Sequence, residues 1–172
     1  MVLGIEHKVI ARMLEGFDSD PTLQDIPTPQ VAPNEVLVRV RASSVNPVDN
    51  AIVSGMLKDM VEHEFPILLG GDFAGVVERV GSHVSGLSVG DEVFGFIPGM
   101  SPKVHDGSWA ELIAIPESIA IRKPNGVDTA SAGAAGLAAI TAMSALDAVP
   151  FPRERPSSWW ALTAAWAASP SS

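Results

Sequence analysis

Few side chains in this sequence could do chemistry, and their types exclude several kinds of site. The 172 residues contain no cysteine, which rules out disulfides, a thiolate metal site and a cysteine nucleophile. A catalytic zinc needs three protein ligands drawn from Cys, His and carboxylates. The histidines show no spacing typical of such ligands, although His63 and Glu64 are adjacent. We therefore expect no metal site and interpret the four histidines as surface or loop residues: His7, His63, His83 and His105.

One polar residue, Asn46, stands directly before Pro47 in the run SSVNPVD. Asparagine is favoured at the residue that caps a helix, and proline fits the first helical turn. The run therefore predicts a short helix over residues 47–56, capped by Asn46. Asp49 falls in the first turn of this helix, where acidic side chains are favourable, and we interpret it as structural.

The pattern of apolar residues predicts a domain built mainly from strands. Valines alternate with other residues over 36–41, and glycines separate this run from further apolar runs. Short strands at even spacing favour a small barrel or sandwich. The proline-rich stretch 16–34 is expected to be a loop. The strands are expected at residues 8–14, 36–41, 72–80, 91–97 and 108–115.

After these strands the sequence becomes rich in alanine, which favours a helix over residues 129–148. Asp128 could cap it. Gly133 and Gly136 weaken the helix slightly but allow close packing. The larger side chains that are spaced to form a buried face are Leu137, Ile140, Met143, Ser144 and Leu146.

Five motifs follow one another in an order that resembles a known family. They are SSVNPVDNAIVSG (43–55), FPILLGGDFAGVVERVG (65–81), VGDEVFGF (89–96), GSWAELIAIP (107–116) and AAGLAAITAMSAL (134–146). Together they resemble the catalytic domain of a medium-chain dehydrogenase/reductase, in its zinc-free, quinone oxidoreductase-like branch. The resemblance implies a mainly β fold, with a GroES-like barrel over 1–127 and, at 128–149, the linking helix of a Rossmann domain that binds NADP(H).

The resemblance also implies a reaction: hydride transfer from NADPH to a quinone or an enone. Asn46 matches the family's asparagine near nicotinamide and substrate, and its amide could donate to a substrate carbonyl. Thr141 matches a threonine that approaches the nicotinamide. Asn46 is thus assigned to catalysis and cofactor binding, and Thr141 to cofactor binding; a purely structural role is left open for both. Trp109 is expected to pack. Zinc-dependent relatives carry Gly-His-Glu where this chain has Gly71-Asp72-Phe73.

Residues 150–172 do not continue the family pattern, because the chain contains no glycine after Gly136. The family continues with a strand and a glycine-rich turn that approaches the cofactor pyrophosphate. Tryptophan has one codon, so moving the reading frame back by one base converts Trp159-Trp160-Ala161 into (Val, Leu or Met)-Val-Gly and places another Gly across Trp166-Ala167. We expect a frameshift near residues 148–152 that truncated the cofactor domain and left 150–172 as an aberrant, disordered tail. The truncated chain is then expected to be weakly active or inactive. An unrelated natural tail is the alternative.

Composition limits the partners. The net charge of −9 argues against nucleic acid and anionic membranes, and we expect no signal peptide and no apolar run of transmembrane length. These features favour a cytoplasmic protein and allow a homodimer. The small-molecule quinone or enone substrate is what the resemblance implies. The alternative function is a stand-alone GroES-like binding or assembly module without catalysis.

Overall fold

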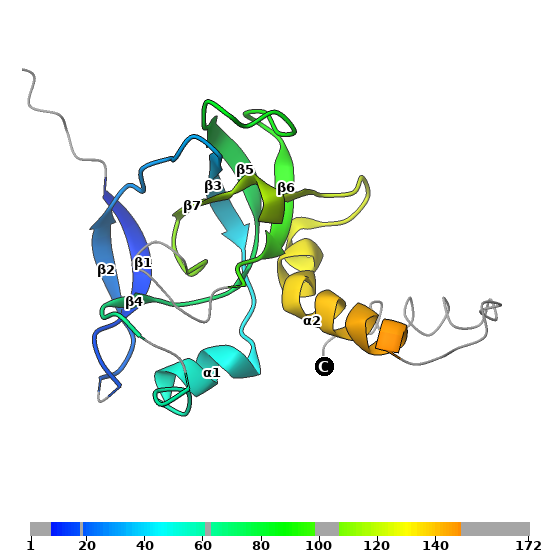
Figure 1. Cartoon of the computed structure of the whole chain (residues 1–172). Coiled ribbons are helices and arrows are strands. Elements are labelled where there is room, and N and C mark those ends of the chain that lie inside the picture. Colours follow the sequence, from blue (N-terminus) through cyan, green and yellow to red (C-terminus); the bar gives the residue numbers. More distant parts are fainter. Residues whose placement is uncertain (1–7, 18, 61–62, 99–106, 149–172) are drawn as a thin grey trace, which may run out of the picture. The chain divides into compact units, whose positions relative to one another are not determined.

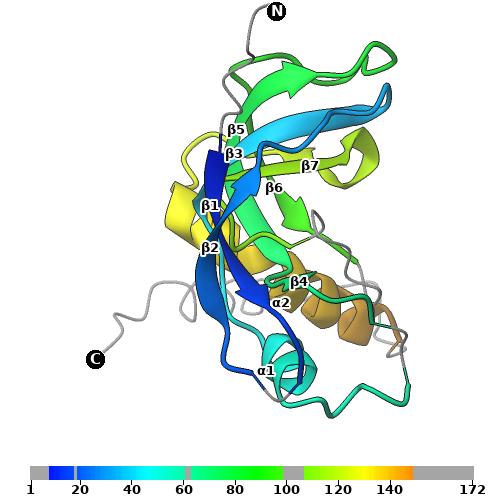
Figure 2. The ribbon, with the colours of Figure 1, turned by 90° about the vertical axis from the view of Figure 1, so that its left-hand side faces the viewer.

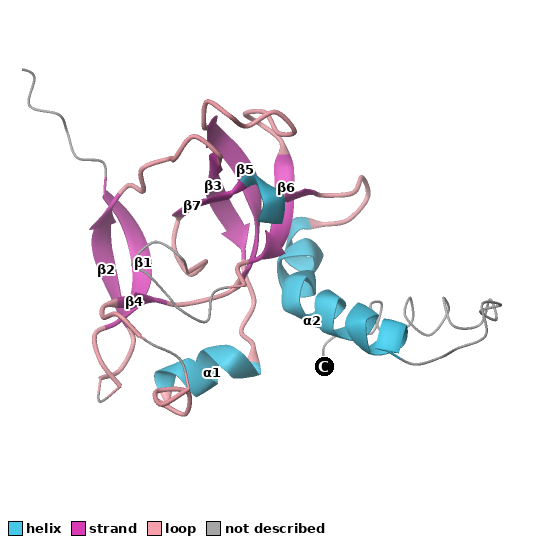
Figure 3. Ribbon diagram, viewed as in Figure 1, coloured by secondary structure: helices cyan, strands magenta, loops and turns pink. Residues whose placement is uncertain are grey.

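The computed structural model describes residues 8–17, 19–60, 63–98 and 107–148. Strands predominate in this part of the chain (Figures 1 and 3), which confirms the mainly β prediction. The tail at 150–172 lies outside the described residues. The elements in chain order are β1 (Lys8–Leu14), β2 (Thr22–Pro27), β3 (Glu35–Ala42), α1 (Pro47–Val53), β4 (Ile67–Leu68), β5 (Asp72–Val80), β6 (Glu92–Phe96), β7 (Leu112–Pro116), the 3₁₀ turn Glu117–Ile119, β8 (Ile121–Arg122) and α2 (Thr129–Ala148).

The first sheet has the order β2-β1-β4, with β1 in the middle. β2 pairs antiparallel with β1 from Met13↔Thr22 to Lys8↔Pro27. The prediction of a loop over 16–34 is therefore wrong for β2. Its prolines misled the prediction, because Pro21 precedes the strand and Pro27 ends it, and an edge strand tolerates proline at such positions. Helix α1 lies at one end of this sheet (Figure 2).

The second sheet has the order β7-β3-β5-β6-β8, and all of its pairs are antiparallel. β3 is the strand with alternating valines, and Val36 and Val38 are fully buried, as the alternation predicts. Leu37 between them is also buried, because the register of β3 on β5 shifts between Leu37 and Val38. Such a bulge turns a side chain away from the face that regular alternation would give it.

The two sheets are joined through the segment that leads into β7. Ala11 of β1 forms a bridge with Ala110, and the Arg12 N–H donates to the Trp109 carbonyl at 2.8 Å. One apolar cluster takes side chains from both sheets, including Val9, Met13, Val36, Phe73 and Ile113. The arrangement is that of a small barrel around a common core, which agrees with the expected fold. The domain boundary at residue 127 stays a prediction.

Helix α2 begins and ends where the sequence predicts. Asp128 caps it: the Ser131 N–H donates to Asp128 Oδ1 at 2.9 Å, and the Ser131 hydroxyl donates to Oδ2 at 2.6 Å. These bonds lower the pKa of Asp128. The boundary between two compact units falls inside the helix, between Ile140 and Thr141.

The buried residues of α2 differ from the prediction. They are the small residues Ala132, Gly133 and Gly136, whereas Ile140 and Met143 are each 52% exposed. Ile140 and Met143 lie at helical spacing from these small residues, on the same side of the helix. The sequence therefore predicted the correct side of α2, but the large residues on that side are not the buried ones. Close approach selects small residues here, because a Cβ at Gly133 would lie 2.7 Å from that of Ala42.

By length and composition alone, α2 is also apolar enough to cross a membrane; it is the single helix of this kind in the ranges described. The expectation that no apolar run reaches that length is therefore wrong. Core helices of soluble proteins pass the same test, so this property is weak evidence for a membrane.

Candidate functional site

The loop between β3 and α1 is attached to Asp72, the first residue of β5. Asp72 is fully buried (0% exposed). Its Oδ2 accepts hydrogen bonds from the Ser44 hydroxyl and, at 3.0 Å, from the Asn46 side-chain amide. Its Oδ1 accepts the backbone N–H of Leu137 in α2 at 2.7 Å. One carboxylate thus joins the loop, the barrel and the first part of α2.

Asn46 is held in one orientation by these contacts. Its Nδ2 donates to Ser44 Oγ and to Asp72 Oδ2, both at 3.0 Å. The reversed amide is excluded, because it would place the carbonyl oxygen against a carboxylate that can only accept. Both amide protons are therefore engaged, and no proton remains for a substrate carbonyl in this arrangement. The assignment of Asn46 to catalysis and cofactor binding stays a prediction, but the amide's available atom is its oxygen.

Asp49 forms a hydrogen bond with the backbone of Asn46. Its Oδ2 accepts the Asn46 backbone N–H at 2.6 Å, and the two residues are arranged as a capping box at the start of α1. Asp49 is only 3% exposed. Burial raises its pKa, the Asn46 N–H opposes that shift, and the nearby charge of Asp72 adds to it. This placement agrees with the structural interpretation of Asp49.

The β3–α1 loop is also fixed from the side of residues 108–109. The Ser43 hydroxyl donates to the Asp72 carbonyl at 2.7 Å and lies 3.0 Å from Ser108 Oγ. The Trp109 indole N–H donates to the Ser44 carbonyl at 3.0 Å. Trp109 therefore packs, as expected, and also positions the loop. A Cβ at Gly70 would collide with the Trp109 ring, so glycine is needed beside it.

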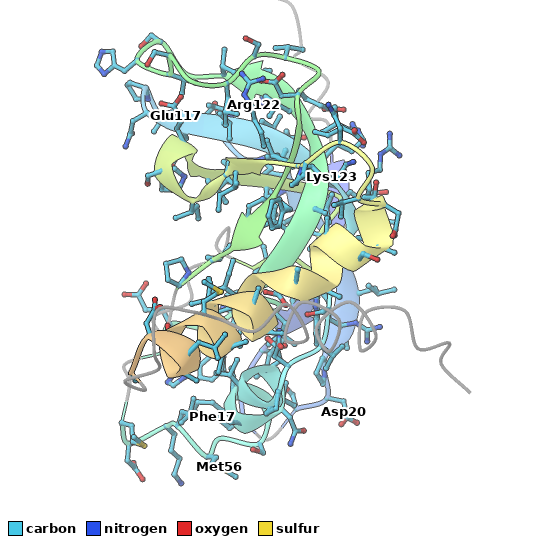
Figure 4. All side chains as sticks on the ribbon, turned by 90° about the vertical axis from the view of Figure 1, so that its right-hand side faces the viewer. Phe17, Asp20, Met56, Glu117, Arg122 and Lys123 are labelled. Atoms are coloured by element: carbon cyan, nitrogen blue, oxygen red, sulfur yellow. The ribbon has the colours of Figure 1, made fainter. Side chains whose placement is uncertain are left out.

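Apolar side chains gather at the α1 end of the molecule. Phe17, Ile52, Val53 and Trp109 pack against the buried residues Leu14, Ile67 and Leu69. Figure 4 shows Phe17 and Met56 at the α1 end, with Glu117, Arg122 and Lys123 at the other. The side chains near α1 that remain mostly exposed are Val45 (75%), Met56 (71%) and Met60 (75%). Val45 precedes α1 in the sequence, and Met56 and Met60 follow it.

Thr141 lies one helical turn beyond Leu137 on α2, and its side chain is exposed. It belongs to the second compact unit, whereas Asn46 belongs to the first. Its assignment to cofactor binding stays a prediction.

Metal ligands are not gathered in the described ranges, which hold no group of three or more His, Cys, Asp or Glu side chains suited to an ion. His63 lies edge-on to Phe17, with ring centroids 5.1 Å apart, and both of its ring nitrogens are buried without a partner. His7 and His105 lie outside the described residues. The prediction that the chain binds no metal stays a prediction.

Asp72 and Ser44 are the residues that sequence reasoning missed. The sequence did contain a signal, an aspartate directly after Gly70-Gly71 and directly before the apolar run at residues 73–77. A charged side chain in such a place must have partners, because a buried carboxylate is costly without them. The identity of those partners depends on contacts that are distant in sequence.

Comparison with known proteins gives a consistent picture. The sequence model of the alcohol dehydrogenase GroES-like domain matches residues 32–125. The chain is 34% identical over 109 residues to a chloroplast envelope quinone oxidoreductase homolog of Arabidopsis thaliana, covering 63% of this chain and 32% of that protein. It is 36% identical over 120 residues to the chloroplastic NADPH-dependent alkenal/one oxidoreductase of the same plant, covering 68% and 31%.

A solved structure shares the fold. An alcohol dehydrogenase superfamily protein from Novosphingobium aromaticivorans matches with a TM-score of 0.72 and 33% identity, covering 79% of this chain and 40% of that one. The GroES-like fold expected from the motifs is thereby confirmed. The chain spans about a third of the length of the curated relatives it matches.

Proposed function

Because the chain belongs to the alcohol dehydrogenase GroES-like domain family, with quinone and enone oxidoreductases among its relatives, we propose that it forms the catalytic domain of an NADPH-dependent oxidoreductase. The proposed reaction is hydride transfer, without zinc, to a quinone or to the electron-poor C=C bond of an enone. The observation that carries the proposal is the fixed loop of Asn46, which also presents the exposed apolar side chain of Val45.

The chain's own residues would position and shield the reactants. The loop is held at Ser43, Ser44 and Asn46 by bonds to Asp72 and Trp109, so its geometry exists before a ligand arrives. Such preorganisation is a main source of catalysis when the cofactor carries the chemistry. The apolar side chains near α1, among them Val45 and Met56, would receive the substrate and exclude water. NADPH, when bound, would supply the hydride.

Asn46 offers a partner for the nicotinamide end of NADPH, whereas the sequence offers none for its pyrophosphate. The acceptor oxygen of Asn46 suits an amide or hydroxyl donor, as a nicotinamide carboxamide offers. No glycine-rich turn follows α2 in the sequence, so the chain has no counterpart of the turn that binds the pyrophosphate in the family. We therefore propose that the cofactor's phosphates are held by a second domain, and that this chain alone binds NADPH weakly.

A chimaera tests the proposed reaction. Residues 1–148 would be joined to the nucleotide-binding domain of the Arabidopsis alkenal/one oxidoreductase, and NADPH oxidation would be followed with an enone and with a quinone. Turnover should persist after treatment with a metal chelator. The matched control is the same chimaera with Asn46→Ala, which should fold but turn over more slowly. A chimaera that folds, binds NADPH and is inert toward both substrates, or that requires zinc, would contradict the proposal.

A further inference from the structure

We propose that Asp72 is a positioning residue for Asn46, which makes Asn46 act on a ligand as a hydrogen-bond acceptor. The proposal rests on the contacts around a carboxylate that the family assignment leaves without a role. The part that concerns a ligand also rests on the proposed function.

The first step concerns the groups that donate hydrogen bonds to the Asp72 carboxylate. A carboxylate buried without partners is strongly unfavourable, so its position is defined by the groups that donate to it. Here the donors come from three places: the Ser44 hydroxyl, the Asn46 amide and the Leu137 backbone N–H. Asp72 cannot turn without leaving at least one of them unpaired.

The second step concerns the direction of the Asn46 amide. Its nitrogen has two protons, and the structure directs them to Asp72 Oδ2 and Ser44 Oγ. The remaining polar atom is the carbonyl oxygen, which has two lone pairs. One of them is left for a ligand even when the capping box with Asp49 is counted. Asn46 is therefore set to receive an N–H or O–H group.

The third step links this orientation to α2. Leu137 donates to the Asp72 oxygen that does not contact Asn46. The approach is close, because a Cβ at Gly136 would collide with that same oxygen. A shift of this part of α2 would therefore move the carboxylate and, with it, the amide of Asn46.

Proton exchange of side-chain amides tests the positioning in the full chain, without cofactor. The side-chain NH₂ signal of Asn46 would be assigned by its loss in Asn46→Asp. The exposed residues Asn34, Asn50 and Asn125 serve as internal references. Exchange at Asn46 should be slower than at these references by about tenfold or more, as expected for a hydrogen bond to a charged group. Equal rates in the wild type would overturn the proposal.

Two variants distinguish the hydrogen bond from Asn46 to Asp72 from the one to Ser44. Asp72→Asn keeps the shape and removes the charge, and should release the Asn46 protons to reference rates. Ser44→Ala keeps Asp72 and should release only one of the two protons. If Asp72→Asn does not fold, the wild type and Ser44→Ala still decide the question. Unchanged Asn46 exchange in a folded Asp72→Asn protein, or release of both protons by Ser44→Ala, would refute a positioning role for Asp72.

Three small probes test the acceptor role. The full chain would be titrated with 1-benzyl-1,4-dihydronicotinamide, its N-methyl amide and its N,N-dimethyl amide, with binding read from the Trp109 indole signal. The first two retain an N–H, so affinity should fall only at the third, by about tenfold. Asp72→Asn should abolish the difference. Equal binding of all three would refute the acceptor role, whereas no binding of any probe would contradict the proposed function and leave the exchange experiment to judge Asp72.

Discussion

Replacing Gly136 by alanine should destabilise this protein, although the same change stabilises most helices. Alanine is favoured over glycine inside a helix by about 1 kcal/mol. At position 136, however, the added methyl group would lie 2.7 Å from the Gly95 carbonyl oxygen and closer still to Asp72 Oδ1. Neither group can move away easily, since Gly95 is in a sheet and Asp72 is buried with three donors.

The size of the effect follows from the contacts that would change. Overpacking a core costs about 1–3 kcal/mol. Displacing Asp72 Oδ1 also weakens its bond from the Leu137 N–H, and hydrogen bonds to charged groups contribute roughly 1.5–3 kcal/mol. Against these losses stands the gain in helix propensity of about 1 kcal/mol. The free energy of unfolding should therefore fall by roughly 1.5–5 kcal/mol.

Urea denaturation of the full chain measures this difference. The matched control is Ala138→Gly at an exposed position of the same helix, which changes propensity alone and should lose about 1 kcal/mol. The reasoning is refuted if Gly136→Ala equals or exceeds the wild type in stability while Ala138→Gly loses the expected amount. That outcome would mean that α2 does not approach Asp72 in solution as the structure describes.

Four further outcomes are expected. Burial raises the pKa of Asp49, so the free energy of unfolding should fall as pH rises from the ordinary aspartate range through that raised pKa. Urea midpoints measured against pH should fall less in Asp49→Asn than in the wild type. Parallel pH profiles of the two proteins would contradict this prediction. NADPH should bind the isolated chain weakly or not at all in a fluorescence titration, and micromolar binding would disprove this. Metal analysis after dialysis should find far less than one zinc per chain, a full equivalent being the contrary result. The coding DNA, read one base back near residue 150, should stay open and encode a product roughly twice as long; an early stop codon would remove the frameshift account.

The fold could be predicted where the signal is local. Alternating valines gave β3, and the cap at Asp128 with the alanine-rich run gave both ends of α2. β2 was missed because its pairing with β1, and not its own composition, makes it a strand. The buried face of α2 was assigned to large residues, because helical periodicity says which side of a helix is apolar but not how close the neighbouring element comes.

The site could be predicted only as single residues. Asn46 is recognisable from Pro47 and the surrounding motif, but the direction of its amide depends on Asp72, which is 26 residues away in the sequence. The bond from Leu137 spans 65 residues. Sequence reasoning offered this amide as a donor to a substrate carbonyl, whereas in the structure its protons are directed to Asp72 and Ser44. The types of residues at the site follow from the motifs, whereas their hydrogen-bond roles follow from long-range contacts.

The position of Asp72 also bears on the prediction that the chain binds no zinc. The resemblance places Gly71-Asp72-Phe73 where zinc-dependent relatives have Gly-His-Glu. In this chain both Asp72 oxygens are already bonded, and the residue is fully buried, so an ion could reach it only by displacing Ser44, Asn46 or Leu137. The same carboxylate supplies the contacts that hold the loop. A buried aspartate can therefore give the loop a rigidity that, in a zinc site, metal coordination would otherwise supply.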